Sequence, residues 1–239
     1  LASHDLAQDA EAGLAYPANR VRWHAPIVRP RKDVVCLGQN YAAHAKELKN
    51  APPATPIYFT KPPTSVIGPD EPIPYPRGLT TRFDWEVELG VVIGIGGRDI
   101  DEAHALDHVF GYTVFNDVSA RELQFRTSQW FKGKSLDGTC PMGPVIVTAD
   151  EVEDPQALAL RLTVNGKRKQ DGHTRDMIFS VARIIADLSA GMTLEPGDAI
   201  STGTPDGVGD GKNPPEYLQP GDIVEAEVER IGVLRNPVR

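Results

Sequence analysis

The sequence predicts an α+β fold, rich in β-structure, of a sandwich or rolled-sheet type. Many short strand-like segments occur along its 239 residues, and the helical segments between them are also short. Nine prolines between residues 52 and 76 allow only short strands and turns there, because proline removes a backbone donor and breaks regular elements. No internal repeat interrupts this pattern, so one β-rich unit is the expected architecture.

The first elements are predicted between residues 33 and 48. Residues 1–30 show no clear periodicity and are interpreted as an N-terminal arm or the remnant of a small domain, so the main domain spans 31–239. An apolar run at 33–38 predicts a short strand that ends at Gly38. A short helix is expected from Tyr41 to Leu48, with Asn40 as its N-cap.

A longer strand is predicted over Phe83–Gly94, because apolar side chains alternate along it from Trp85 to Ile93. This alternation leaves Glu86 and Glu88 side by side on the opposite face. The segments that follow are predicted to form a helix, a strand and one or two helical turns, at residues 101–107, 109–115 and 119–126.

The C-terminal part opens with a predicted hairpin, since Asn165-Gly166 separates two strand-like runs at 158–164 and 167–170. Apolar residues at helical spacing predict a helix over 177–188, and Gly191 follows as a stop signal. Two further strands are expected, at 198–202 and 222–230.

Composition restricts the classes of partner. The formal net charge of −8 argues against nucleic acid and against anionic membrane surfaces, which are themselves negative. No apolar stretch approaches the length of a membrane span. Cys36 lies in an apolar run and is predicted to be a buried thiol, although a disulfide with Cys140 stays open. So few cysteines, with no signal-peptide pattern, predict a reducing, cytoplasmic location.

The two glutamates are the most informative polar residues. At about 5 Å and an effective dielectric near 20, two such charges repel each other by roughly 3 kcal/mol. Glu86 and Glu88 therefore lie either on a solvated sheet face or beside a cation. The strand continues into Val91-Val92-Ile93, which is apolar on both faces and indicates burial. Buried carboxylates must be paired, protonated or bound to metal.

Four further residues allow both an ordinary and a functional interpretation. Asp117 follows an apolar strand and is either a helix cap or a third oxygen ligand for a hard cation such as Mg²⁺, Mn²⁺ or Ca²⁺. Lys134 is either a surface lysine or a fixed cation near that metal, where it would stabilise an enolate oxygen. His44 and Glu47 are either an exposed pair on one helix face or a dyad in which the imidazole deprotonates water.

Together these motifs resemble the fumarylacetoacetate hydrolase family. The resemblance covers about residues 30–239, and the motifs occur in the family's order. The matching stretches are Gly38–Tyr41 with His44 and Glu47, Trp85–Leu89, Asn116–Arg121, Lys132–Ser135 with Cys140-Pro141, Met177–Ser180, Thr202–Pro205 and Gly207–Gly209.

The resemblance implies a fold, an assembly and a set of site residues. The fold is a mixed β-sandwich roll of the family's C-terminal type, so residues 31–239 would be the catalytic domain, usually in a homodimer. One Mg²⁺ or Mn²⁺ per active site is implied, with Ca²⁺ as a further possibility. By similarity, the metal ligands are Glu86, Glu88 and Asp117, the catalytic residues are His44, Glu47 and Lys134, and the substrate-binding residues are Gln124, Thr204 and Arg121.

The resemblance also implies a small 2-oxo acid as the substrate. The first expectation is a metal-dependent hydrolase that cleaves a C–C bond of an acylpyruvate-type 2,4-dioxo acid to pyruvate and a carboxylic acid. The alternatives are an oxaloacetate decarboxylase or tautomerase and a 2-hydroxymuconate-type isomerase. A binding protein without turnover is a third class, which the complete set of site residues disfavours.

Overall fold

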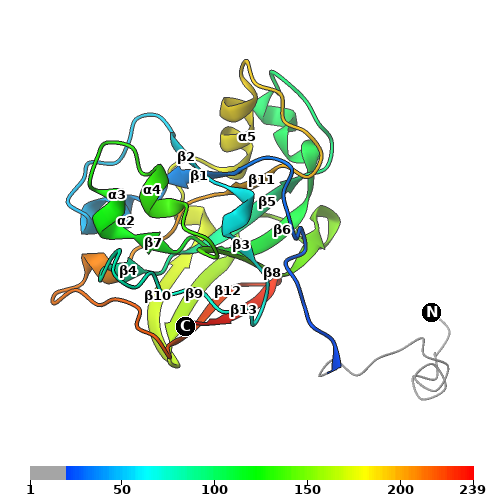
Figure 1. Cartoon of the computed structure of the whole chain (residues 1–239). Coiled ribbons are helices and arrows are strands. Elements are labelled where there is room, and N and C mark those ends of the chain that lie inside the picture. The colour runs from blue at the N-terminus through cyan, green and yellow to red at the C-terminus, as the bar shows by residue number, and fades with distance from the viewer. Residues whose placement is uncertain (1–19) are drawn as a thin grey trace.

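Two β-sheets of unequal size form the body of the protein in the computed structural model, which describes residues 20–239 (Figure 1). Most of the predicted N-terminal arm, residues 1–19, lies outside the described residues. The larger sheet is mixed and has the order β2-β1-β11-β5-β6-β8-β3, at Ile57–Lys61, Val34–Gly38, Ala199–Ser201, Val87–Ile93, Val109–Asn116, Cys140–Thr148 and Val66–Ile67. The smaller sheet is antiparallel and has the order β10-β9-β12-β13, at Lys167–His173, Ala159–Val164, Ile223–Val228 and Gly232–Pro237.

Short helices complete the fold. In the described part of the chain the α-helices are α2, α3, α4 and α5, at Ala42–Glu47, Arg121–Gln124, Phe131–Lys134 and Val181–Ser189. The 3₁₀ turns lie at Pro63–Ser65, Glu102–His108, Ala149–Glu151, Thr174–Asp176 and Gly209–Gly211. Helices α2, α3 and α4 gather at one end of the large sheet, beside the two-stranded pair β4 (Phe83–Asp84) and β7 (Ser119–Ala120) (Figure 1). No helix within residues 20–239 is long and apolar enough to cross a membrane.

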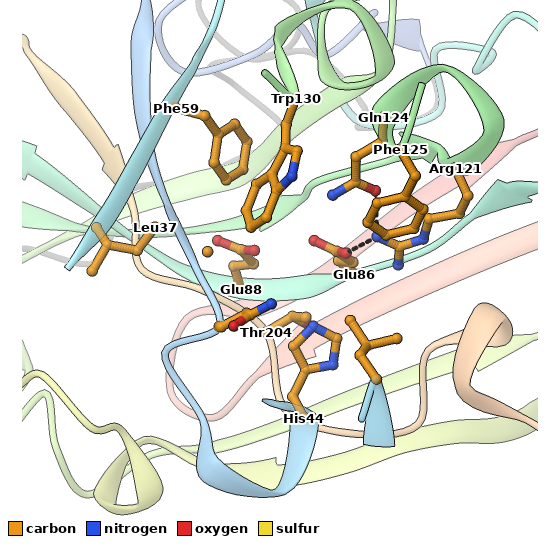
Figure 2. Close-up of a pocket in the computed structure, with 13 residues that line it drawn as sticks. Leu37, His44, Phe59, Glu86, Glu88, Arg121, Gln124, Phe125, Trp130 and Thr204 are labelled. Carbon is orange, nitrogen blue, oxygen red and sulfur yellow. Dashed lines mark hydrogen bonds and ion pairs between the residues drawn. The ribbon is translucent and has the colours of Figure 1, made fainter. Parts of the chain in front are cut away.

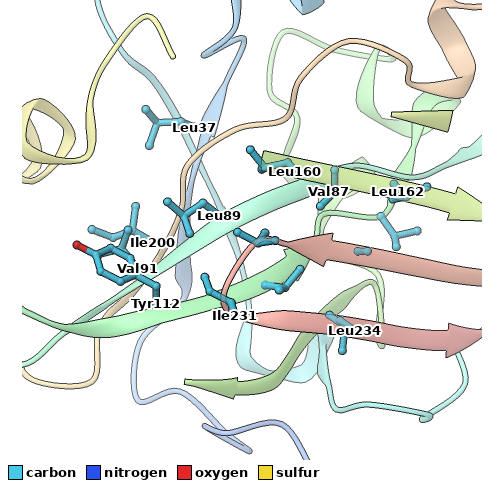
Figure 3. Close-up of a cluster of buried hydrophobic side chains, with 14 of the residues drawn as sticks. Leu37, Val87, Leu89, Val91, Tyr112, Leu160, Leu162, Ile200, Ile231 and Leu234 are labelled. Atoms are coloured by element: carbon cyan, nitrogen blue, oxygen red, sulfur yellow. The ribbon is translucent and has the colours of Figure 1, made fainter. Parts of the chain in front are cut away.

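The main core lies where the two sheets face each other. Alternate residues of β5 point into it, because successive side chains of a strand point to opposite faces. Figure 3 shows Val87 and Leu89 of β5 close to Leu160 and Leu162 of β9, and all four side chains are buried. A second apolar cluster on the other face of the large sheet includes Val92, Phe115 and both cysteines, which are free thiols. Burial of β5 on both faces is therefore confirmed.

The predicted strand over Phe83–Gly94 is interrupted in the structure. Strand β4 ends at Asp84 and β5 begins at Val87, so Trp85 and Glu86 lie in a break between them. Pairing explains the break, because β4 pairs with β7 whereas β5 pairs with β6 and β11. The apolar face that begins at Trp85 is confirmed, since Trp85 and the alternate residues of β5 belong to one core cluster.

The prediction that Asn40 caps helix α2 is wrong. The helix has Tyr41 at its N-cap position, without a capping side-chain bond. Instead, the Asn40 amide accepts from the Phe179 N–H at 2.8 Å and donates to the Thr202 carbonyl at 2.8 Å. Asn40 therefore joins segments distant in sequence, and these long-range bonds replace the local cap.

The remaining differences concern element boundaries and two strands that were not predicted. Helix α5 begins four residues later than predicted, because the Ser180 hydroxyl caps it by accepting from the Arg183 N–H. The helix expected at 101–107 is 3₁₀, and the turns expected at 119–126 begin only after β7. The Asn165-Gly166 hairpin is confirmed, with positive φ angles of 51° and 72° at the two residues. Strands β8 and β13 were not predicted; β8 pairs with β6 in the large sheet, and β13 forms a second hairpin with β12.

Candidate active site

Three acidic side chains meet at the end of the large sheet. Glu88 lies on β5, Glu86 lies in the break before it, and Asp117 directly follows β6. Two hydrogen bonds hold the segments together, from the Asp117 N–H to the Glu86 carbonyl at 2.8 Å and from the Glu86 N–H to Asn116 Oδ1 at 3.0 Å. One carboxylate oxygen from each acid lies within 4.8 Å of the others, and all three side chains are buried.

Three buried cations surround these carboxylates. Lys134 donates from Nζ to Glu86 Oε2 at 2.8 Å and to Asp117 Oδ2 at 2.7 Å. Lys61 donates to the other oxygen of Asp117 at 2.7 Å. Arg121 Nη1 lies 2.6 Å from Glu86 Oε1. Glu86 and Asp117 are thus both paired with positive charges, and Lys134 is a buried partner of these acids rather than a surface lysine.

Asp84 is a fourth buried acid, and it connects the site to the C-terminal part of the chain. Its Oδ2 accepts from Arg121 Nε at 2.9 Å, and its two oxygens accept from the N–H groups of Gly209 and Asp210 at 2.7 and 3.0 Å. The guanidinium of Arg121 therefore lies between Asp84 and the proposed metal ligand Glu86. This contact fixes the position of Glu86.

Glu88 differs from the other acids because its oxygen is bonded only to neutral donors. Its Oε2 accepts from the Ser201 hydroxyl at 2.6 Å and from the Gly203 N–H at 2.7 Å. Burial raises the pKa of Glu88 well above its usual range, and the charges of Asp117 and Glu86 raise it further. Burial also opposes ionisation of Glu86, but Lys134 and Arg121 outweigh it and hold the pKa of Glu86 well below its usual value.

The charge balance of this cluster suits a divalent cation. Four buried carboxylates face three buried cations, so one negative charge remains when all of them are ionised; the members are Asp84, Glu86, Glu88, Asp117, Lys61, Arg121 and Lys134. Carboxylate oxygens are the ligands that hard divalent ions prefer. The donor set therefore fits Mg²⁺ or Mn²⁺, and such an ion would leave the cluster with a net positive charge suited to an anionic substrate.

His44 and Glu47 form the predicted pair on helix α2. His44 Nδ1 lies 3.4 Å from Glu47 Oε2, and the His44 ring is buried. The Gly207 N–H donates to both Glu47 oxygens, at 3.0 and 3.1 Å. The structure thus excludes the interpretation as a fully exposed pair, because the glutamate is held by the backbone and the imidazole is held by the glutamate.

The segment after β11 holds three of these acids through its backbone. The Gly203 N–H donates to Glu88, the Gly207 N–H donates to Glu47, and the Gly209 N–H donates to Asp84. Gly203 and Gly207 have φ angles of +95° and +99°, a conformation that glycine adopts without steric cost. We call residues 203–210 the amide segment.

A pocket of about 330 Å³, including its open mouth, lies between His44 and the two glutamates (Figure 2). Its floor contains Glu86 and Glu88, and the His44 ring lies across from them. The other lining residues are mostly apolar or neutral: Leu37, Gly38, Gln39, Leu48, Phe59, Arg121, Gln124, Phe125, Trp130 and Thr204. Asp117 and Lys134 lie behind the glutamates and do not line the pocket.

The three predicted substrate-binding residues line this pocket but differ in the hydrogen-bonding groups that they leave free for a substrate. Gln124 uses its Oε1 to accept from Arg121 Nη1 at 3.0 Å, and its amide lies above Glu86 (Figure 2). The Thr204 hydroxyl already donates to the Val87 carbonyl at 2.9 Å. The Arg121 guanidinium is engaged by acidic side chains. In this arrangement Gln124 is the best placed of the three to reach a substrate oxygen, and all three roles stay predictions.

Sequence reasoning missed two parts of the site, Lys61 and Asp84. Lys61 ends β2 and is fully buried, although it lies 56 residues from its partner Asp117. Its sequence surroundings, Thr60-Lys61-Pro62, give no sign of burial. Asp84 precedes the glutamate pair in Asp-Trp-Glu-Val-Glu, and this density of acid in an apolar run was the signal available.

Comparisons with known proteins agree with the geometry. The family model described as the fumarylacetoacetate (FAA) hydrolase C-terminal domain matches residues 33–239. The oxaloacetate tautomerase YisK of Bacillus subtilis is 45% identical over 232 residues, covering 96% of this chain and 77% of that protein.

Solved structures show the same similarity. A fumarylacetoacetate hydrolase from Exiguobacterium antarcticum has a TM-score of 0.87 at 48% identity, covering 93% of this chain and 80% of that one. The fumarylpyruvate hydrolase of Pseudomonas aeruginosa, solved with Mn²⁺ and pyruvate, has a TM-score of 0.80 at 34% identity, covering 88% and 90%. The predicted fold class is therefore confirmed, and the chain belongs to the fumarylacetoacetate hydrolase family.

Proposed function

We propose that the protein is a divalent-metal-dependent enzyme that interconverts the keto and enol forms of a small 2-oxo acid of the oxaloacetate type. The observation that carries this proposal is the position of His44, the one histidine among the described residues lining the pocket, opposite Glu86 and Glu88. Keto–enol exchange moves a proton between carbon and oxygen, which is the kind of transfer that a positioned histidine catalyses. The similarity to a Bacillus tautomerase along 96% of the chain supports the same reaction.

The proposed roles of the chain's own residues follow from the contacts. His44 accepts the proton from the carbon next to the keto group, and Glu47 orients the imidazole through Nδ1. Gln124 donates its amide N–H to a substrate oxygen. Lys134, Lys61 and Arg121 hold the carboxylates in place. Bound by Glu86, Glu88 and Asp117, Mg²⁺ or Mn²⁺ would supply Lewis-acid chemistry at the keto oxygen.

Hydrolysis of an acylpyruvate C–C bond, the first expectation from the sequence, is the second candidate. The held pair His44–Glu47 favours it, because the same imidazole can take a proton from water rather than from carbon. Similarity to the fumarylpyruvate hydrolase, solved with Mn²⁺ and pyruvate, supports it as well. Decarboxylation and 2-hydroxymuconate-type isomerisation, a homodimer, the cytoplasmic location and the domain division at residue 31 stay predictions.

Product analysis separates these reactions. The purified protein is incubated with Mn²⁺ and either enol-oxaloacetate or acetylpyruvate, with chelator-treated protein as control. Loss of enol absorbance without pyruvate supports tautomerisation, pyruvate with CO₂ indicates decarboxylation, and pyruvate with a carboxylic acid indicates hydrolysis. Unchanged substrates, or equal rates with and without chelator, contradict the proposal.

Replacing His44 by alanine tests the proton-transfer role. We expect tautomerisation or hydrolysis to fall by about 10²-fold, because general acid–base catalysis contributes an effect of this size. Loss of CO₂ from a 2-oxo acid needs no proton acceptor, so the rate of any decarboxylation should fall less than the rates of tautomerisation and hydrolysis. Mn²⁺ affinity, measured by calorimetry, should stay unchanged, since His44 makes no hydrogen bond to the three carboxylates. An equal loss in every reaction contradicts the assigned role.

A further inference from the structure

The indole of Trp130 lines the pocket on the side of Glu86 and Glu88 that faces away from His44 (Figure 2). Trp130 precedes helix α4, lines the pocket, and lies edge-on to the Phe59 ring, with 5.6 Å between ring centroids and 65° between planes. Figure 2 shows the indole directed down toward Glu88, between Phe59 and Gln124. Space above the glutamates is therefore limited by an aromatic ring rather than by solvent.

Gly38 at the end of β1 fixes how closely the indole approaches. A Cβ atom at residue 38 would lie 2.2 Å from Trp130 Cζ3 and 2.8 Å from Cη2, far inside van der Waals contact. Only glycine lets the strand backbone lie against the ring. Gly38 and Phe59 thus hold one indole position from two neighbouring strands, β1 and β2.

The same helical turn links Trp130 to the carboxylates. The Lys134 N–H donates to the Trp130 carbonyl at 3.2 Å, while Lys134 Nζ bonds to Glu86 and Asp117. Nζ also lies 4.9 Å from the centroid of the Phe59 ring. Because α4 is anchored to the floor of the pocket, the indole stays at a fixed height above it.

Large side chains line the walls near the indole and leave little room for a long substrate tail. Leu37, Leu48, Phe59 and Phe125 are apolar, and the one lining guanidinium, Arg121, is paired with acids. The pocket is small, because its volume of about 330 Å³ already includes the open solvent at its mouth.

We propose that Trp130, held by Gly38 and Phe59, is a specificity-determining residue that limits the length of the substrate chain beyond the 2-oxo carboxylate. The enzyme then prefers compact 2-oxo acids such as oxaloacetate and acetylpyruvate to acylpyruvates with longer acyl chains. This inference rests on the proposed function, because it assumes that a 2-oxo acid binds above Glu86 and Glu88.

The test compares kcat/KM for acetylpyruvate and hexanoylpyruvate in the wild type and in Trp130→Ala. We expect the wild type to prefer acetylpyruvate, and the ratio of hexanoyl to acetyl substrate to rise at least about 10-fold in the variant, since pocket contacts discriminate methylene groups by 10–200-fold. Phe131→Ala is the matched control, because Phe131 is the next residue, is half exposed and does not line the pocket. Its ratio should equal that of the wild type.

A binding measurement complements the kinetics. Pyruvate added to the Mn²⁺-loaded protein should quench tryptophan fluorescence, and Trp130→Phe should remove most of the quenching, because Trp23 and Trp85 do not line the pocket. Trp130→Leu replaces the alanine variant if that variant does not fold. A wild type inactive on every 2-oxo acid contradicts the proposed function. An active wild type with an unchanged substrate ratio in folded Trp130 variants contradicts the length limit alone.

Discussion

Replacing Glu88 by glutamine should abolish metal binding and lower activity by more than about 10³-fold, while the metal-free protein stays at least as stable as the wild type. The amide oxygen of glutamine can still accept from the Ser201 hydroxyl and the Gly203 N–H. What disappears is one buried negative charge near Glu86 and Asp117. The loss therefore affects the metal site and not the packing.

The stability gain of this variant should depend on pH. Folding raises the pKa of Glu88, so its contribution to stability is fully present below the unfolded pKa of about 4.3 and is lost as pH rises through the folded value. Glutamine does not titrate. In chelator, the difference in unfolding free energy between Glu88→Gln and the wild type should therefore grow as the pH increases from about 4.

Calorimetric titration with Mn²⁺ and urea unfolding at several pH values measure both effects. Glu102→Gln is the matched control, because Glu102 lies far from the site in a 3₁₀ helix and its side chain is 49% exposed. That variant should bind Mn²⁺ like the wild type. Undiminished Mn²⁺ binding by Glu88→Gln, or a large loss of metal-free stability, would show that Glu88 is a structural residue.

Replacing Arg121 by methionine should cost about 3–5 kcal/mol of unfolding free energy, because removing one partner leaves buried charges uncompensated. Arg121 is 1% exposed and contacts both Asp84, at 2.8–2.9 Å, and Glu86, at 2.6 Å. Methionine fills similar space without the charge. The effect should appear in urea unfolding as a lower midpoint with an unchanged slope.

Arg82→Met is the control for this prediction. Arg82 also pairs with an aspartate, Asp210, but its side chain is 38% exposed, and Asp210 keeps a hydrogen bond from the Tyr217 hydroxyl at 2.7 Å when Arg82 is removed. Its loss should cost no more than about 1 kcal/mol. A double variant, Asp84→Asn with Arg121→Met, should recover part of the lost stability by removing one unpaired charge. Equal stability of Arg121→Met and the wild type would mean that the guanidinium does not neutralise these acids.

Local sequence signals predicted the elements whose structure depends on near neighbours. Alternation identified the buried face of β5, and Asn165-Gly166 identified the hairpin because few residues accept two successive positive φ angles. The break at Trp85 and Glu86 was not predictable in this way. It arises because β4 and β5 pair with different strands, which is a property of the whole fold.

Within the active site, too, local sequence signals predicted some residues, whereas long-range contacts determine the others. Mutual repulsion indicated that Glu86 and Glu88 lie either on a solvated face or beside a cation, and the structure buries both and places Asp117 beside them. Lys61 carried no local signal, because its burial depends on an acid 56 residues away. The capping prediction for Asn40 was wrong because its side-chain amide bonds to the backbone of residues 179 and 202 rather than to its own helix.

The amide segment has a consequence for how this protein can change over evolutionary time. Residues 203–210 reach Glu88, Glu47 and Asp84 through main-chain N–H groups, which every amino acid except proline possesses. Side chains of this segment other than the glycines and Thr204 can therefore change without removing the hydrogen bonds to the three acids. A single inserted or deleted residue would move all of these donors out of register at once, so this stretch should tolerate substitution in homologous enzymes far better than any alteration of its length.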